Sequence, residues 1–213
     1  MRGVPWWGIV SSAATPVLLV SGWTIAADLQ PQPFDAIKQS VSSLAGAGAD
    51  ERWVMTLAFI VVAGCYITTA LALRPAAFAG RLALIAAGLA GMLVAASPQA
   101  APGDFSLAHA FWSALGFAFL AGWPLAARRP GRLVPWALRP APAVCASAVI
   151  TGLLAWFLVE LVTGGSDIGL AERVLGCAQA TWPLLVALSC RRAIAAASPE
   201  SRHQPRQQPL GNS

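Results

Sequence analysis

The sequence predicts an all-α, polytopic membrane protein with six transmembrane helices in one bundle and no soluble domain. The chain of 213 residues is 57% hydrophobic and only 11% charged, whereas soluble domains average about 45–50% apolar and about 25% charged residues. A chain of this length cannot hide so much apolar surface in its own core. We therefore expect the lipid bilayer to be its solvent and main partner.

Six apolar runs have roughly the length of about 17–25 residues that a membrane-spanning helix needs. The predicted helices cover residues 6–27, 53–73, 82–97, 107–127, 144–163 and 174–190. The third run is the shortest. The first run resembles a secretory signal. However, Arg2 is the only basic residue before it, and no convincing cleavage site of small residues follows it, so we interpret the run as a transmembrane helix.

The charged residues in the connections predict the orientation. Of the 14 Lys and Arg residues, only Lys38, Arg52 and Arg173 fall on one side of the predicted bundle, and the remaining eleven fall on the other. Basic residues of short loops stay in the cytoplasm. We therefore expect a multi-pass protein of the cell inner (plasma) membrane with both termini cytoplasmic, and no nucleic-acid partner.

The ends of the chain and the first outer connection carry their own signals. Residues 193–213 are polar and contain three prolines, so we expect a disordered cytoplasmic tail. In the stretch "QPFDAIKQSVSSLAGAGADER", Phe34, Ile37, Val41 and Leu44 recur at helical spacing. This pattern predicts a short amphipathic helix, lying on the outer face or folded over the bundle mouth; the alternative is an irregular loop.

Two further patterns concern helix packing. Pro124 and Pro183 each remove a backbone donor inside a predicted helix, so we expect kinks there, with the freed carbonyls bonded by neighbouring hydroxyls. The third run has a face of small residues, which predicts a buried, central helix. These residues are Ala83, Ala87, Gly91 and Ala95.

The sequence offers little recognisable chemistry. No ionisable residue falls in the middle of a predicted helix, which disfavours an ion-coupled pump. Only His109 of the two histidines is in a helical run, which disfavours a bis-histidine haem. The four cysteines show no paired spacing, and no nucleophile elbow, P-loop or dinucleotide fingerprint occurs. We expect no metal and no cofactor.

Polar residues instead gather at the predicted outer ends of the helices. His109 with Asp104 or Glu51 could act as an acid–base pair on a lipid headgroup, although Asp104 or Ser106 is as readily explained as the cap of the fourth helix. The weak catalytic candidates are therefore His109, Asp104 and Glu51. The candidates for lining an outward-facing ligand pocket are Asp28, Ser42, Glu51, Arg52, His109, Glu160, Glu172 and Arg173.

Four stretches carry a family resemblance when they are taken in order. They are "PFDAIKQSVSSLAGAGADERW", "LRPAAFAGRLAL", "SPQAAPGDFSLAHAFWSALGF" and "AERVLGCAQATWPLLVALSCRR". Together they resemble the DUF998 family of bacterial six-helix membrane proteins of unknown function. The resemblance covers roughly Trp6–Arg192 and strengthens the six-helix topology. The family is loosely similar to the Frag1/DRAM/Sfk1-like group. That similarity implies a link with lipid or membrane organisation, but it does not imply a particular reaction.

Three functions fit these observations. We expect a non-enzymatic membrane protein that binds a lipid or a small apolar ligand, or that serves as a membrane accessory protein with partners the sequence does not identify. One alternative is a membrane-embedded enzyme that uses His109 and an outer carboxylate. The other is a transporter of a neutral solute, hinged at Pro124 and Pro183.

Overall fold

The computed structural model of the protein describes residues 3–100 and 106–197. Its long helices are α1 (Trp6–Asp28), α2 (Trp53–Ala72), α3 (Phe78–Ala95), α4 (Leu107–Ala127), α5 (Pro140–Thr163) and α6 (Ile168–Ala197), and two short 3₁₀ helices are η1 (Val41–Ala45) and η2 (Trp136–Leu138). The described part of the chain contains no strand. All six long helices are long and apolar enough to cross a membrane, which confirms the all-α, multi-pass prediction.

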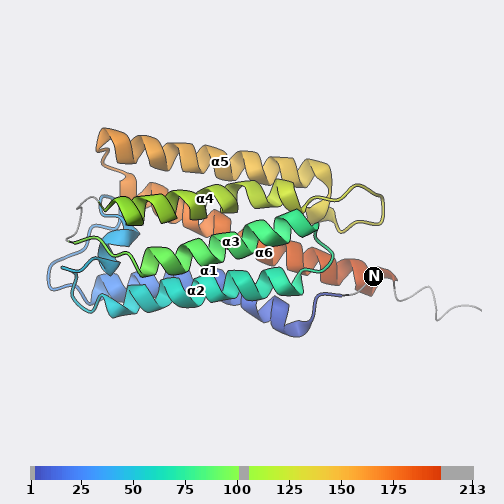
Figure 1. The fold of residues 1–213 in the computed structure, drawn as a ribbon, viewed down its shortest axis with the longest axis horizontal. Coiled ribbons are helices and arrows are strands. Elements are labelled where there is room, and N and C mark those ends of the chain that lie inside the picture. The colour runs from blue at the N-terminus through green and yellow to red at the C-terminus, as the bar shows by residue number, and fades with distance from the viewer. Residues whose placement is uncertain (1–2, 101–105, 198–213) are drawn as a thin grey trace, which may run out of the picture.

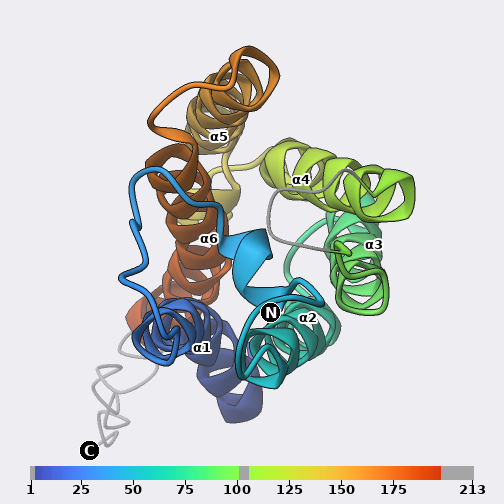
Figure 2. The same cartoon turned by 90° about the vertical axis from the view of Figure 1, so that its left-hand side faces the viewer.

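The helices follow one another around a bundle. Each packs against the next in the chain, and α6 closes the arrangement by packing against α1. Figure 1 shows the helices running roughly alongside one another, and Figure 2, which looks along them, shows α5 on the outside of α4 and α6. The short helix η1 lies in the middle of the bundle at one end. We call this the η1 end and the opposite end, where α1 begins and α6 finishes, the terminal end.

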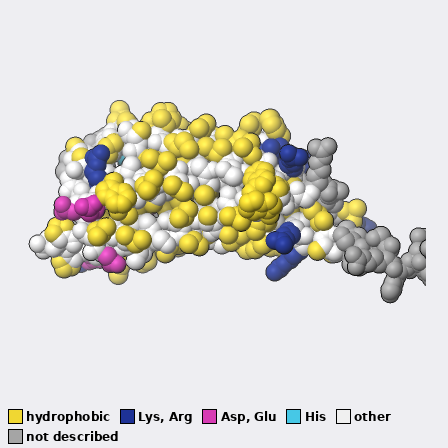
Figure 3. Space-filling model, turned by 90° about the horizontal axis from the view of Figure 1, so that it is seen from below, with side chains coloured by type: hydrophobic (Ala, Val, Ile, Leu, Met, Phe, Trp, Pro, Cys, Tyr) yellow, Lys and Arg dark blue, Asp and Glu magenta, His cyan; other side chains and the backbone are white. Residues whose placement is uncertain are grey.

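The two ends of the bundle differ in charge. Figure 3 shows Asp and Glu at the η1 end, most of the visible Lys and Arg at the other end, and a broad hydrophobic band between them. A band of this kind matches the hydrocarbon layer of a bilayer, with charged groups at the two water interfaces. The charge segregation predicted for the connections is thus a property of the folded molecule.

Small residues allow two of the helix pairs to pack closely. A Cβ placed on Gly22 of α1 would lie 2.4 Å from the Cβ of Ala58 in α2, and one on Gly80 of α3 would lie 2.3 Å from the Cα of Ala127 in α4. Only glycine fits contacts this short. Without a hydrophobic driving force between helices in lipid, such close van der Waals packing is a main source of association.

The prediction that the third run forms a central helix is wrong. In Figure 2, α3 lies at the periphery, between α2 and α4, and α6 has the largest buried share of the six candidate spans. Gly88 of α3 lies close to α2, because a Cβ placed on it would be 2.7 Å from the Ala63 carbonyl oxygen. Gly88 is not part of the predicted small-residue face. Two residues of that face, Ala87 and Gly91, line the cavity described below.

The carbonyl that Pro124 frees is that of Leu120, and no hydroxyl of the described residues bonds it as predicted; a neighbouring hydroxyl enters the helix one position further on. Ser147 of α5 donates its hydroxyl to the Ala121 carbonyl at 2.9 Å and accepts the Leu125 N–H at 3.2 Å. These two groups are the i and i+4 partners of an ordinary α-helical bond. The Ser147 hydroxyl is therefore inserted into the hydrogen-bond ladder of α4 beside the proline.

Several predicted boundaries need correction. The third helix begins at Phe78 rather than at residue 82, and the last extends from Ile168 to Ala197. Residues 193–197 are thus helical, while residues 198–213 of the predicted tail lie outside the described chain. The short helix predicted between α1 and α2 is present only as the five-residue 3₁₀ helix η1; the residues before it form a turn and not the earlier part of an amphipathic helix.

Candidate functional site

Residues 36–45, here called the cover segment, close the η1 end of the bundle. Figure 2 shows its helix η1 surrounded by the long helices. Val41 and Leu44 are buried. The side chain of Ser40 caps η1 by accepting the Ser43 N–H, and the Ser43 hydroxyl donates back to the Ser40 carbonyl at 2.6 Å. Pairing of both groups allows this short element to remain buried without loose backbone donors.

Glu172, in the first turns of α6, holds the beginning of η1. Its side chain is only 7% exposed. One carboxylate oxygen accepts the Val41 N–H at 2.7 Å, and the other accepts the Ser42 hydroxyl at 3.2 Å. A buried carboxylate needs such donors to offset the loss of water. The contact joins residues about 130 positions apart and fixes the cover segment to α6.

The next residue, Arg173, holds the other half of the cover segment. Its Nη1 donates to the carbonyls of Ala36 at 2.8 Å and Gln39 at 3.0 Å. The guanidinium also lies over two aromatic rings, 5.7 Å from the centroid of Trp23 and 5.5 Å from that of Phe34. Arg173 therefore binds the cover segment through its backbone carbonyls and packs against α1 through Trp23.

The backbone of α6 completes this attachment. The Leu170 N–H donates to the Ile37 carbonyl at 3.0 Å. A Cβ on Gly169 would lie 2.3 Å from the Gln39 carbonyl oxygen and less than 3.0 Å from those of Ala36 and Ile37. Only glycine at this position lets the two backbones approach so closely.

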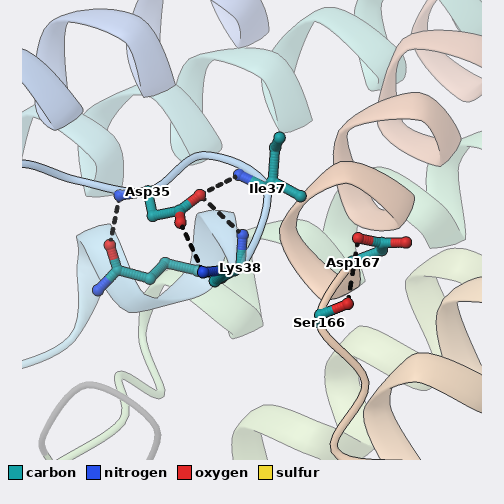
Figure 4. A network of polar contacts seen from close by, with 6 residues as sticks. Asp35, Ile37, Lys38, Ser166 and Asp167 are labelled. Carbon is teal, nitrogen blue, oxygen red and sulfur yellow. Dashed lines mark hydrogen bonds and ion pairs between the residues drawn. The ribbon is translucent and has the colours of Figure 1, made fainter.

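A local turn shapes the start of the cover segment. Asp35 accepts the backbone N–H groups of Ile37 and Lys38 at 3.0 and 3.2 Å, and its carboxylate pairs with the Lys38 ammonium at 3.6 Å (Figure 4). These backbone hydrogen bonds lower the pKa of the Asp35 carboxyl below its ordinary value. Because its side chain bonds the amides two and three residues further on, Asp35 directs the chain into a turn rather than a helix.

A cavity of about 120 Å³ lies beneath the cover segment, within the bundle. Its wall includes residues of α1, η1, α2, α3, α4 and α6, and most of them are apolar or aromatic. The apolar lining consists of Leu19, Val41, Val62, Ala63, Ala87, Gly91, Val94, Gly116, Leu120 and Gly176, and the aromatic lining of Trp23, Phe59, Tyr66, Trp112 and Phe117. A concave, largely apolar space with a few polar groups is the usual form of a small-ligand site.

The polar groups of the cavity lie at two depths. Glu172 and Ser42 line it at the η1 end. Glu172, Gly176 and Gln179 follow at helical spacing on one face of α6, so Gln179 lies about 10 Å further along the helix axis. Gln179 is 1% exposed and donates its Nε2 to the Phe117 carbonyl at 3.3 Å.

Gln179 makes its one side-chain hydrogen bond through Nε2, and no hydrogen bond joins its Oε1 or the Tyr66 hydroxyl to another described residue. Both residues line the cavity, so these polar atoms are available to a molecule within it. Pro183, one turn beyond Gln179, also removes the N–H that would bond the Gln179 backbone carbonyl. The inner part of the cavity is therefore the region in which polar atoms lack hydrogen-bond partners from the described part of the protein.

His109 does not meet a described carboxylate. It is buried in the first turn of α4, and its Nδ1 lies 3.1 Å from the Ser97 carbonyl at the end of α3. Ser106 caps α4 by accepting the His109 N–H at 3.4 Å, as one of the two predicted caps requires. Asp104 lies outside the described residues. Glu51 is exposed and accepts a hydrogen bond from the Trp53 indole instead.

The other candidate residues are dispersed. Asp28 and Arg52 are exposed at helix ends. Glu160 organises the connection between α5 and α6, where it accepts the Asp167 N–H at 3.1 Å and the Trp156 indole N–H at 3.3 Å. The structure thus brings together Ser42, Glu172 and Arg173. Within residues 3–100 and 106–197, no group of three or more His, Cys, Asp or Glu side chains could hold a metal ion.

Tyr66, Gln179 and the aromatic residues of the cavity were not among the site residues predicted from the sequence. Tyr66 is the only tyrosine of the chain, and Gln179 is a lone amide within an apolar run. A single polar side chain inside a predicted membrane helix tends to face the bundle interior, and that signal identifies both.

Comparison with known proteins adds the family. Neither the curated proteins nor the solved structures contain a match to this chain. A family model described as DUF998, protein of unknown function, matches residues 13–189. This match covers all six long helices in whole or in large part, together with the cover segment and the cavity. The chain is a member of the DUF998 family.

Proposed function

We propose that this membrane protein binds a small, largely apolar molecule in its central cavity, and that the cover segment closes over that molecule. The observation that carries the proposal is the double role of Glu172. This buried carboxylate lines the cavity and also holds the cover segment through Val41 and Ser42. A ligand that engages Glu172 therefore acts directly on the attachment of the cover.

The size of the cavity favours a small molecule or one group of a larger molecule. An engineered apolar cavity of about 150 Å³ binds benzene or xenon, and this cavity measures about 120 Å³. A whole lipid does not fit in that volume. A lipid would enter only with its head or with the end of one acyl chain.

The charge distribution supports an orientation. The terminal end carries most of the basic residues of the connections, such as Arg74, Arg128, Arg129 and Arg132. By the positive-inside rule this end faces the cytoplasm. We place the protein in the inner (plasma) membrane with both termini cytoplasmic, so that the cover segment faces the outside and the ligand enters from there.

Enzymatic use of His109 has less support than binding. Its ring nitrogen is directed to a backbone carbonyl, and the histidine is not among the residues that line the cavity. General acid–base catalysis needs a group within reach of the reacting atoms. Transport of a neutral solute would use the same cavity, and uptake into proteoliposomes separates transport from binding alone.

The test fills the cavity from α4. Ser113 lines it, whereas the adjacent Ala114 is exposed on the outer face of α4. Ser113→Phe places a benzene-sized ring in the space and should abolish binding of a small neutral probe such as neohexanol, measured by tryptophan fluorescence in lipid nanodiscs. Ala114→Phe adds the same ring outside and should leave binding unchanged. Equal affinity in wild type and Ser113→Phe would contradict the proposal.

A further inference from the structure

We infer that the central cavity receives a small organic ammonium group, for which Glu172 provides the counter-charge. The inference rests on the proposed function and names the ligand class. Glu172 is buried, lines the cavity and makes no ion pair with any described residue. The protein supplies it with two hydrogen bonds, whereas a carboxylate offers about four acceptor positions. Its remaining positions are available to a ligand.

A cation is the ligand that a buried carboxylate favours most. An isolated buried charge is costly, and pairing with an opposite charge offsets that cost. The neighbouring cation, Arg173, does not fill this role. Its Nη1 is bonded to three carbonyls, those of Ala36, Gln39 and Gly169, and it does not line the cavity. These carbonyl dipoles and the two rings beneath it also offset the repulsion between Arg173 and a bound cation.

The aromatic wall matches the same ligand. Trp23, Phe59, Trp112 and Phe117 line the cavity together with Tyr66. Aromatic faces attract ammonium groups, and rings grouped around a desolvated space are the common recognition device for alkylated ammonium ions. Trp23 already takes part in such an interaction through Arg173, 5.7 Å from its centroid.

The inner polar atoms extend the ligand description. Tyr66 and Gln179 line the cavity, and neither the Tyr66 hydroxyl nor the Gln179 Oε1 has a hydrogen bond to a described residue. They accept or donate a hydrogen bond to a hydroxyl, whereas Glu172 lies about 10 Å away along α6. An amino alcohol of the choline or ethanolamine type has both groups and a suitable size. This chemistry occurs in free amines and in lipid heads.

The experiment compares choline with neohexanol, its uncharged carbon isostere, on the full-length protein. Nanodiscs made only of phosphatidylglycerol contain no competing ammonium group, and tryptophan fluorescence reports binding. We expect choline to bind at least about tenfold more tightly than neohexanol, as desolvated cation–π and charge pairing imply. Glu172→Gln should remove this preference, because it lowers choline affinity about tenfold more than it lowers neohexanol affinity. Glu160→Gln, a carboxyl outside the cavity, should keep the preference.

The outcomes separate this inference from the proposed function. Equal or tighter binding of neohexanol by the wild type overturns the ammonium inference and leaves the proposed function intact. Binding of neither probe contradicts the proposed function. If Glu172→Gln binds neither probe, the same two affinities are measured for Trp112→Leu. A greater loss of choline affinity than of neohexanol affinity in this variant supports the inference, and an equal loss of both overturns it.

A second arm identifies the source of the ammonium group. The nanodiscs are made with part of the phosphatidylglycerol replaced by phosphatidylcholine. Competition with free choline assigns the site to a lipid head, and unchanged choline affinity assigns it to a free amine. Both results support the ammonium class.

Discussion

Replacement of Gly169 by alanine should release the cover segment from α6. The new Cβ would lie 2.3, 2.6 and 2.8 Å from the carbonyl oxygens of Gln39, Ala36 and Ile37. To restore ordinary van der Waals distances, the cover segment must move away from α6 by about 1 Å. The hydrogen bonds that those carbonyls accept then become too long to be hydrogen bonds. The helix itself gains from the exchange, because alanine is a better helix former by about 1 kcal/mol.

The magnitude follows from the bonds at risk. The three carbonyls accept the Leu170 N–H and two bonds from the Arg173 Nη1. Bonds to a charged group are stronger than neutral ones, but exposure reduces the two Arg173 bonds to the ordinary range of about 0.5–1.5 kcal/mol, so the loss of all three bonds costs about 1.5–4.5 kcal/mol, with about 3 kcal/mol as the middle value. After the gain in helix propensity, we expect the cover segment to open more easily by about 2 kcal/mol, or roughly thirty-fold in its opening equilibrium.

Hydrogen exchange measures this opening. Mass spectrometry on peptides covering residues 36–45, with the protein in nanodiscs, should show exchange roughly thirty-fold faster in Gly169→Ala than in the wild type. Gly152→Ala is the matched control, because a Cβ at this α5 position meets nothing within 4 Å, and it should leave the cover segment unchanged. Identical exchange in wild type and Gly169→Ala would refute the close-approach argument.

Three further predictions concern the bundle and its connections. Gly80→Ala, whose Cβ would overlap the Ala127 backbone at 2.3–2.5 Å, should lower stability by about 1–3 kcal/mol in thermal unfolding, whereas Gly64→Ala, in open space, should not. His109→Ala should cost about 1 kcal/mol through its lost bond and leave choline and neohexanol affinity unchanged; impaired binding would place His109 in the site. Because the pKa of Asp35 is lowered on folding, its turn should be stabilised above the ordinary value of 3.8 and loosen as the pH falls through the lower folded value. Amide exchange in wild type and Asp35→Asn should therefore differ in neutral buffer and converge in acid; an equal difference at both pH values would contradict this assignment.

The six helices could be predicted because each is an apolar run of spanning length. The errors occurred where charged residues were treated as helix ends. Arg81 lies within α3 because its Nε donates to the Ala70 carbonyl. Glu172 and Arg173 lie within α6 because the cover segment supplies partners for both. A charged side chain can therefore lie inside a helix when another segment supplies its partner, and that partner is distant in the sequence.

The cover segment shows the same limit. Its apolar residues recur at helical spacing, but Asp35 bonds the following amides and Glu172 captures the Val41 N–H. Tertiary hydrogen bonds therefore override a local pattern of only a few residues. Of the candidate site, the sequence pointed to Ser42, Glu172 and Arg173 but could not show that α6 unites them. The cavity depends on how five helices pack, which no local pattern encodes.

The central claim is that Glu172 joins a ligand in the cavity to the segment that covers it. A structure of the protein determined in lipid nanodiscs with choline present tests this claim most directly. The account predicts non-protein density between Glu172 and Gln179, in contact with the Glu172 carboxylate beneath a closed cover segment. A cavity filled by the protein's own side chains, with Glu172 in contact only with the cover segment, would contradict it.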